Sequence, residues 1–269
     1  MRNAESAAVA APGWVRFPVF EPYPELVCVS TVKAPPAAAE ADDPANMACH
    51  VGPGRERAAE RRAELCRRLG LDFARLAAAE QVHGNRVAVV GADEEGAGRA
   101  DRATAIPGAD GLATDRAGVP LLSLSADCCP LVIFDPVRRA VACVHAGRKG
   151  TAGRIAEAAV AALVRAFGSR PADLVAGIGP SIGPCCYQVG PEIRDEFPDR
   201  PDLFRQRGGA TYLDLWAANR SQLLAAGLRP EAVGATELCT ACDTRRFFSY
   251  RRQGAGCGLL ATVAAVRAG

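Results

Sequence analysis

Residues 119–147 read VPLLSLSADCCPLVIFDPVRRAVACVHAG, which is three short apolar runs separated by turn-forming residues. This pattern predicts three strands, at Val119–Ser125, Leu131–Asp135 and Ala140–His145. The segment Pro136–Arg139 predicts a hairpin connection between the last two strands. Cys128 is therefore expected just after one strand, at the bend before Pro130, and His145 at the end of another.

Predicted helices and further strands flank this block. The helices are Arg55–Leu69, ended by Gly70; Thr151–Phe167, capped by Thr151 and ended by Gly168; and one from a cap at Asp214 to Gly227. The further strands are Arg86–Val90, Asp173–Gly177, Phe247–Tyr250 and Leu259–Val266.

The expected domain organisation is simple. Residues 1–13 are Ala-rich and predicted to be a disordered N-terminus, and Ala34–Pro44 is predicted to be a loop. Residues 14–269 show no repeat and no linker, which predicts one catalytic domain. The fold class is α+β (mixed α/β), a mixed β-sheet sandwich flanked by helices.

Composition excludes several classes of protein. The 269 residues are 49% hydrophobic and 23% charged with a net charge of +2, which gives no basic surface for nucleic acid or an anionic membrane. We find no apolar run near the roughly 20 residues that span a bilayer. The N-terminus does not resemble a signal peptide, and eleven cysteines in a chain this long suit a reduced compartment. We expect a cytoplasmic protein.

Histidine is scarce, because the chain has only three. Two of them stand in distinctive motifs, His83 in QVHGN and His145 in CVHAG. With Cys128 they would offer a soft metal two imidazoles and a thiolate. Three ligands from separate segments are typical of a catalytic site with an open position, whereas a structural zinc finger uses four closely spaced ligands. The alternative is that each histidine is a hydrogen-bonded core or loop residue.

The other motifs either allow two interpretations or lack the spacing of the site they suggest. Gly177-Ile178-Gly179 lacks the spacing of a dinucleotide-binding turn. Cys239-x-x-Cys242 has no partner pair for a four-cysteine zinc site, so we expect no metal or redox role there. Arg148 and Lys149 form either an anion site or a solvated turn. Arg251, within FFSYRR at residues 247–252, could meet a phosphate beside stacked aromatic rings, or lie on an edge strand.

Taken in order, these motifs resemble those of the YfiH-type laccase-domain family over residues 26–265. The shared motifs are QVHG (81–84), SADCxP (125–130), VHAG (144–147), GIGP (177–180) and FFSYRR (247–252). The resemblance implies a single α/β sandwich domain and a zinc site at His83, Cys128 and His145. It also implies phosphorolysis of adenosine, inosine, guanosine and methylthioadenosine, with adenosine deamination. The family's polyphenol oxidase label implies several copper sites, which three histidines cannot supply. A single copper ion could still compete for the zinc site.

The chain departs from the family pattern at several positions. Val32 lies where the family has an arginine and a glycine pair, Arg148 replaces a tryptophan, and Cys257 replaces a common arginine. The metal ligands are unaffected. These departures bear on the substrate pocket.

The leading hypothesis is a zinc-dependent purine nucleoside enzyme that acts on a small-molecule nucleoside and phosphate, as a monomer or weak homodimer. Asp127 would act as a proton shuttle or orient a ligand, and Arg148, Lys149 and Arg251 would bind substrate or phosphate. One alternative is a metal-free cysteine hydrolase with Cys128 as nucleophile and His145 or His83 as base. Another is a zinc-binding family member without catalysis.

Overall fold

The predicted hairpin forms the centre of the molecule. Strands β7 (Cys129–Asp135) and β8 (Ala140–Ala146) pair antiparallel along their whole length in the computed structural model, which describes residues 13–33 and 45–268. Their side chains alternate between two cores: Leu131 and Val144 pack on one face, Val132 and Cys143 on the other. The predictions for residues 1–12 and for the 34–44 loop lie outside the described residues.

The hairpin belongs to a mixed six-stranded sheet in the order β13-β9-β7-β8-β5-β4. Its other strands are β4 (Val87–Val89), β5 (Gly111–Thr114), β9 (Val175–Ile178) and β13 (Val233–Ala235). The β4–β5 and β13–β9 pairs are parallel and the others antiparallel. The mixed sheet predicted from the sequence is confirmed.

A second, five-stranded sheet packs on the first and completes the sandwich. Its order is β1-β2-β14-β6-β3, with β1 (Trp14–Arg16), β2 (Leu26–Thr31), β3 (Ala77–Ala78), β6 (Leu121–Ser125) and β14 (Leu260–Val266). Phe134 and Val141 of the first sheet share a buried cluster with Leu121 and Ala264 of the second. Burial of these apolar side chains between the sheets is the main force that holds them together.

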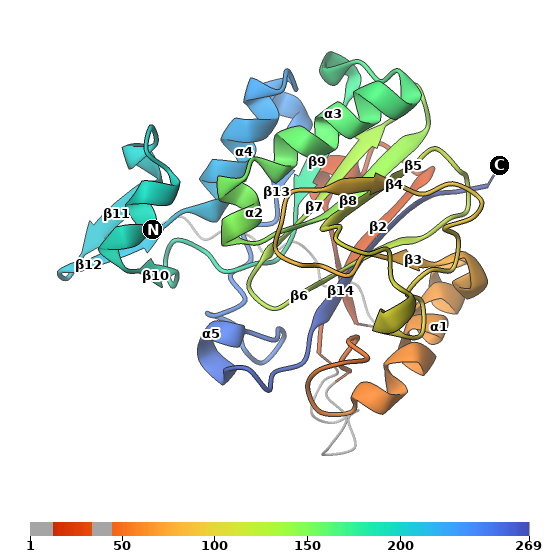
Figure 1. Cartoon of the computed structure of the whole chain (residues 1–269), viewed down its shortest axis with the longest axis horizontal. Coiled ribbons are helices and arrows are strands. Elements are labelled where there is room, and N and C mark those ends of the chain that lie inside the picture. Colours follow the sequence, from red (N-terminus) through yellow and green to blue (C-terminus); the bar gives the residue numbers. More distant parts are fainter. Residues whose placement is uncertain (1–12, 34–44, 269) are drawn as a thin grey trace.

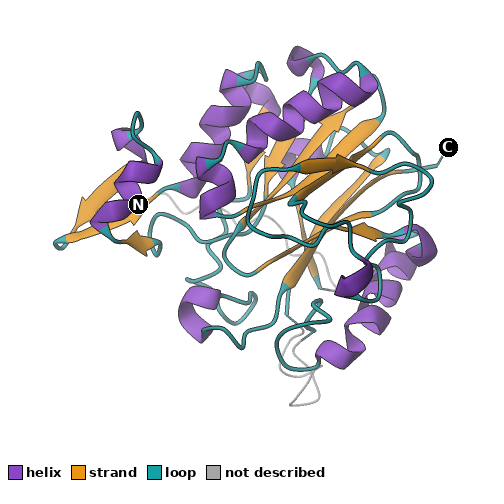
Figure 2. Ribbon diagram, in the orientation of Figure 1, coloured by secondary structure: helices purple, strands orange, loops and turns teal. Residues whose placement is uncertain are grey.

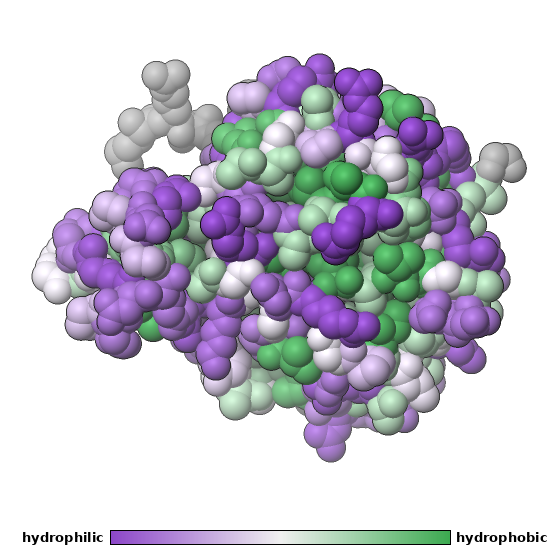
Figure 3. Space-filling view, turned by 45° about the horizontal axis from the view of Figure 1, so that its top comes forward, coloured by the Kyte–Doolittle hydropathy of each residue, from purple (hydrophilic) through white to green (hydrophobic). Residues whose placement is uncertain are grey.

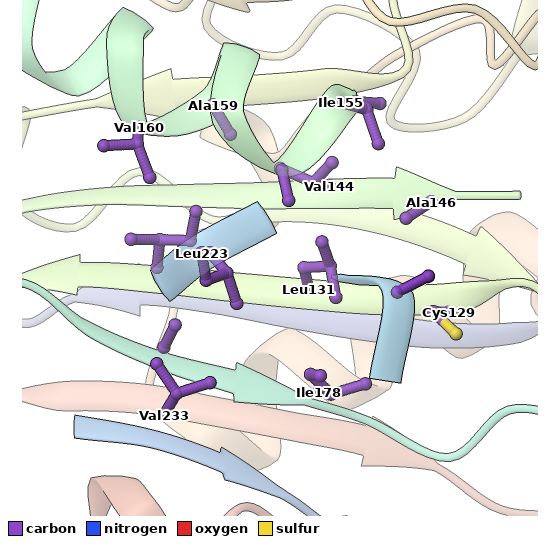
Figure 4. Packing of buried hydrophobic residues seen from close by; sticks show 14 of the residues in the cluster. Cys129, Leu131, Val144, Ala146, Ile155, Ala159, Val160, Ile178, Leu223 and Val233 are labelled. Carbon is purple, nitrogen blue, oxygen red and sulfur yellow. The ribbon is translucent and has the colours of Figure 1, made fainter. Parts of the chain in front are cut away.

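Helices cover the outer faces of the sandwich (Figures 1 and 2). They are α1 (Ala58–Leu69), α2 (Arg148–Ala152), α3 (Ile155–Phe167) and α4 (Leu215–Ala225), whereas the short α5 (Tyr250–Gln253) lies apart from them, near the ends of β6 and β14. Val160 of α3 and Leu223 of α4 pack with Leu131 and Val144 of the six-stranded sheet (Figure 4). On the other sheet, Leu65 of α1 joins the strands' outward-facing residues in a separate cluster.

Two predictions about local structure are wrong. Thr151 does not cap the long helix: it lies inside α2, and α3 begins after Arg154, whose φ of 63° breaks the helix. Phe247–Tyr250 is not a strand, because Phe247 and Phe248 fill an apolar cluster and Tyr250 already begins α5. The caps at Gly70, Gly168 and Asp214 are confirmed.

A small sheet projects to one side of the sandwich. It has the order β10-β12-β11, with β10 (Gln188–Val189), β11 (Phe204–Arg207) and β12 (Ala210–Leu213). In the space-filling view this lobe is mostly hydrophilic, while apolar side chains gather nearer the centre of the face (Figure 3). Over the described ranges, we find no helix with the length and apolar character of a membrane span.

Candidate metal centre

The candidate site lies where the chain crosses from one sheet to the other. The link from β6 to β7 carries Cys128, and the loop from β3 to β4 carries His83. Asp127 and His83 at these crossings have φ of 89° and 63°, left-handed conformations that are strained for residues with side chains. His145 lies near the end of β8 on the face that points between the sheets. Two crossovers and one strand end therefore converge.

The three residues predicted as metal ligands do meet. One nitrogen from each of His83 and His145 and the sulfur of Cys128 lie within 4.8 Å of one another. His145 is buried, Cys128 is half-buried and His83 is exposed, so the group opens to solvent on the His83 side. A Cβ at Gly147 would lie 3.0 Å from Cδ2 of His83 and 3.1 Å from Sγ of Cys128, so a side chain there would crowd two of the three groups.

Asp110 is a functional residue that the sequence reasoning missed. Its carboxylate lies 3.0 Å from Nδ1 of His145 and accepts the backbone N–H groups of Val82, His83 and Gly84. It thus fixes the ring of His145, with Nε2 as the free nitrogen, and the loop that carries His83. Carboxylate–histidine pairs of this kind orient metal ligands in many proteins. Its place just before β5, between the two histidine motifs, was the available signal.

The electrostatics favour a thiolate. Burial by itself would raise the pKa of the Cys128 thiol, but the charge of His145 and hydrogen bonds from both histidines outweigh it and lower the pKa to about 6. For His145, burial opposes charging, yet Cys128 and Asp110 raise its pKa to about 9. The sulfur is therefore held in the form that binds metal. Two imidazoles, one thiolate and the space left by Gly147 suit a soft or borderline ion such as zinc.

Asp127 faces the same cavity but has both carboxylate oxygens occupied. Oδ1 accepts the hydroxyl of Thr240 at 2.6 Å, and Oδ2 accepts the backbone N–H of Arg251 at 2.7 Å. The backbone carbonyl of Asp127 also accepts the N–H of Ile182. These contacts tie the C-terminal segment to the Cys128 bend. The geometry therefore favours the orienting role over the proton shuttle.

A cavity of about 540 Å³ opens in front of the three residues. This volume is in the range of small-molecule sites. Its lining includes Arg148, Tyr187, Tyr250 and Arg251, and also His50, Arg62 and Arg102 from the N-terminal part of the chain. These last three residues could not be grouped from the sequence, because Arg62 lies in α1 whereas His50 and Arg102 lie in separate connecting segments.

The residues predicted to bind phosphate are placed unequally. Arg148 lines the cavity and its guanidinium pairs with Glu196. Arg251 lines it too, stacks over Tyr187 at 5.2 Å and donates to the carbonyl of Gln188. Lys149 is exposed and is not part of the cavity wall. Helix α2, which follows His145, has five residues and is too short to add much of a helix-terminus field.

The residues that depart from the family motifs lie in two different places. Val32 and Cys257 are both buried in one apolar cluster with Phe247 and Phe248. Neither belongs to the cavity wall, whereas Arg148 does. The altered residues at 32 and 257 thus pack together behind the site, and Arg148 is the departure that changes the pocket itself.

One sequence prediction about the cysteines is wrong. The pair Cys239 and Cys242 does have partners, because the fold brings Cys185 and Cys186 against it, with all four sulfurs within 4.8 Å of one another. The adjacent pair was overlooked because it lies on a distant loop and lacks the usual two-residue spacing.

Comparison with known proteins supports the resemblance seen in the motifs. Residues 28–267 match the model of the family described as "Multi-copper polyphenol oxidoreductase laccase". The chain is 41% identical over 213 residues to purine nucleoside phosphorylase YlmD of Geobacillus stearothermophilus, covering 77% of this chain and 78% of that protein. Adenosine deaminase RL5, from an unknown prokaryotic organism, is 34% identical over 219 residues, or 79% of this chain and 83% of the relative.

Solved structures agree with this result. The crystal structure of YlmD from Geobacillus stearothermophilus superposes with a TM-score of 0.88 at 37% identity, covering 96% of this chain and 97% of that one. The Bacillus licheniformis hypothetical protein YfiH superposes with a TM-score of 0.89 at 31% identity, covering 97% and 98%. The predicted fold and the resemblance to YfiH-type proteins are confirmed.

Proposed function

The chain belongs to the multi-copper polyphenol oxidoreductase laccase family, and we propose that it is a zinc-dependent purine nucleoside phosphorylase with some adenosine deaminase activity. The relatives' names support both activities, since one is named a purine nucleoside phosphorylase and another an adenosine deaminase. The observation that carries the proposal is the three-ligand group His83, Cys128 and His145 at the base of an open cavity. Several copper sites are excluded by the histidine count, because the whole chain has three.

In the proposed mechanism, different residues would hold the metal, orient its ligands and position the substrate. His83, Cys128 and His145 would hold zinc, which when bound supplies a Lewis acid facing the cavity. Asp110 keeps His145 in the tautomer whose Nε2 is free. Asp127 positions the segment that carries Arg251.

Arg148 and Arg251 are the proposed phosphate-binding residues on the wall beside Tyr187. Two guanidinium groups on one wall can neutralise a phosphate and hold it against the sugar carbon of a nucleoside. Release of Arg148 from Glu196 would be part of that binding. Lys149 points to solvent, so it would contribute a field and no direct contact.

A metal-free cysteine hydrolase uses the same residues, and the lowered pKa of Cys128 would suit its nucleophile. A cysteine–histidine pair needs one imidazole, however. Here a second imidazole, His83, converges on the same sulfur, and Gly147 leaves space beside all three groups. This convergence is why we favour the metal.

The decisive experiment is chromatography of the products formed from adenosine by the zinc-loaded, tag-free protein, with and without phosphate. We expect adenine and ribose 1-phosphate only when phosphate is present, and a smaller amount of inosine in both reactions. Zinc content is measured on the same sample. Absence of zinc together with rapid alkylation of Cys128 would select the thiol hydrolase, and stoichiometric zinc without turnover across a nucleoside panel would select the zinc-binding family member without catalysis.

A further inference from the structure

Four cysteines from two distant loops form a second cluster beside the cavity wall, named here the cysteine quartet. Cys185 and Cys186 lie in a turn between β9 and β10, and Cys239 and Cys242 follow β13. All four sulfurs lie within 4.8 Å of one another, and the sulfur of Cys242 is 3.4 Å from those of both Cys185 and Cys186. None of the four lines the cavity that faces His83.

We propose that the cysteine quartet binds one zinc ion as a closed, structural site. Four thiolates fill every position of a tetrahedral ion and leave none for substrate. A zinc–sulfur distance of about 2.3 Å places sulfurs roughly 3.8 Å apart in a tetrahedron. The observed separations, from 3.4 Å up to the 4.8 Å limit, bracket that value. A cluster of several irons spreads its thiolates farther apart than a single ion does, so the compact quartet fits one ion.

Hydrogen-bond donors surround the quartet. The backbone N–H of Gly183 donates to Sγ of Cys239 at 3.2 Å. The guanidinium of Arg252 lies 3.6 Å from Sγ of Cys186 and is held there by a bond to the carbonyl of Ala241. Such donors offset the negative charge that four thiolates retain around a divalent ion.

The exposure of the quartet sets it apart from cysteines that only fill space. Cys28, Cys129 and Cys143 are buried in the apolar clusters, where a thiol behaves as a small hydrophobe. Cys185 and Cys242 are exposed. Exposed thiols contribute little to a core and are prone to oxidation, so packing does not explain why they gather.

A metal in the quartet would fix one wall of the cavity. Tyr187 directly follows Cys186, and its ring meets Arg251 of the C-terminal segment. The two loops are otherwise joined by backbone bonds, from Ser181 to Leu238 and from Thr240 to Ser181. An ion shared by both loops would clamp them together and hold Tyr187 at the wall. The site acts on the placement of that wall and takes no part in the reaction.

The test counts zinc, so it does not depend on the nucleoside activity. Tag-free, full-length protein is prepared under reducing conditions, and bound zinc is measured by native mass spectrometry and elemental analysis. We expect two zinc ions per chain in the wild type, one in C185S/C242S and one in C128A. Cys49→Ser, which changes a half-buried cysteine outside both groups, is the matched control and should keep two. The cobalt-loaded C185S/C242S variant should also show much weaker sulfur-to-metal charge-transfer absorption than the cobalt-loaded wild type.

Three results would overturn the proposal. The first is equal zinc content in the wild type and in C185S/C242S. The second is a wild type that holds a single zinc which C128A loses, a result that stands even where C185S/C242S fails to fold. The third is a disulfide within the quartet in freshly prepared, zinc-replete protein, found by thiol counting after denaturation.

Discussion

The His83–Cys128–His145 group and the cysteine quartet are built from similar donor atoms but differ in surroundings. The first has three potential ligands in the lining of a cavity of about 540 Å³, and the second has four, none of which lines that cavity. Ligand number and access to a cavity, more than ligand type, separate a catalytic centre from a structural one. This difference agrees with the catalytic role proposed for the first group and the structural role proposed for the second.

The two groups also differ in what holds them. A buried carboxylate, Asp110, orients His145 and the His83 loop together. The sulfurs of the quartet accept hydrogen bonds from a backbone N–H and from an arginine. These bonds offset the negative charge of the thiolates, and there is no imidazole ring to orient. In a site with an open coordination position, hydrogen bonds from the protein must orient the ligands. In a closed four-ligand site, the bound metal orients the ligands itself.

The largest expected difference in activity is between two variants that each remove one cysteine sulfur, one from each group. Cys128→Ala should lower kcat/KM for phosphorolysis on the order of 10³-fold, because Lewis-acid stabilisation supplies several kcal/mol. Cys242→Ser should lower it about tenfold or less, since only the placement of Tyr187 changes. Steady-state kinetics with adenosine and phosphate measures both. Equal losses in the two variants would contradict the division into a catalytic and a structural site.

Asp110→Asn tests whether the open group depends on its aimed ligands. The amide cannot accept from three N–H groups and His145 as the carboxylate does, so zinc affinity at this site should fall about 10- to 100-fold. Competition with a chromophoric chelator measures the affinity. Asp135→Asn is the matched control: Asp135 is also buried but accepts N–H groups in the β7–β8 hairpin, at the other end of the strands. A loss of the same size in the control would show a general effect on folding.

The two groups also differ in whether their residues could be predicted from the sequence. His83, Cys128 and His145 could be predicted because histidine is scarce and strand periodicity places Cys128 and His145 at strand ends. The quartet could not, because its pairs meet only through the tertiary placement of two loops.

The same limit applies to the fold. The β7–β8 hairpin follows from local alternation and a turn signal, so it was predictable. The break at Arg154 comes beside Gly153, whose carbonyl accepts from the distant Asn85, and the path of Phe247 follows its packing in an apolar cluster; a local pattern does not record such contacts. Asp110 reads as an ordinary turn acid until its partners are seen.

Asp127 connects the two groups, and Asp127→Asn distinguishes positioning from proton transfer. Through Thr240, the neighbour of Cys239, and through Arg251, its carboxylate holds the wall between the cavity and the quartet. Losing a charged acceptor should cost about 1.5–3 kcal/mol of stability. KM for phosphate should rise more than kcat falls, while the zinc content stays the same. A large fall in kcat with unchanged KM and unchanged thermal stability would instead identify Asp127 as the proton shuttle.

The smallest effect concerns acid, which should release metal from both groups by protonating thiolates and imidazoles. The two groups can be compared at low pH only while the protein stays folded, and Glu95, which belongs to neither group and does not line the cavity, helps to set that limit. Its side chain is 17% exposed, and its carboxylate accepts hydrogen bonds from Arg75 and Arg116, which lower its pKa to about 2. Because the folded pKa lies below the ordinary value of about 4.3, the ion pairs stabilise the fold fully above that pH. Their contribution disappears as the pH falls toward 2. Urea unfolding should therefore show Glu95→Gln less stable than the wild type by about 1 kcal/mol at pH 7 and by less at pH 3. A difference that grows as the pH falls would mean that other groups set the acid limit.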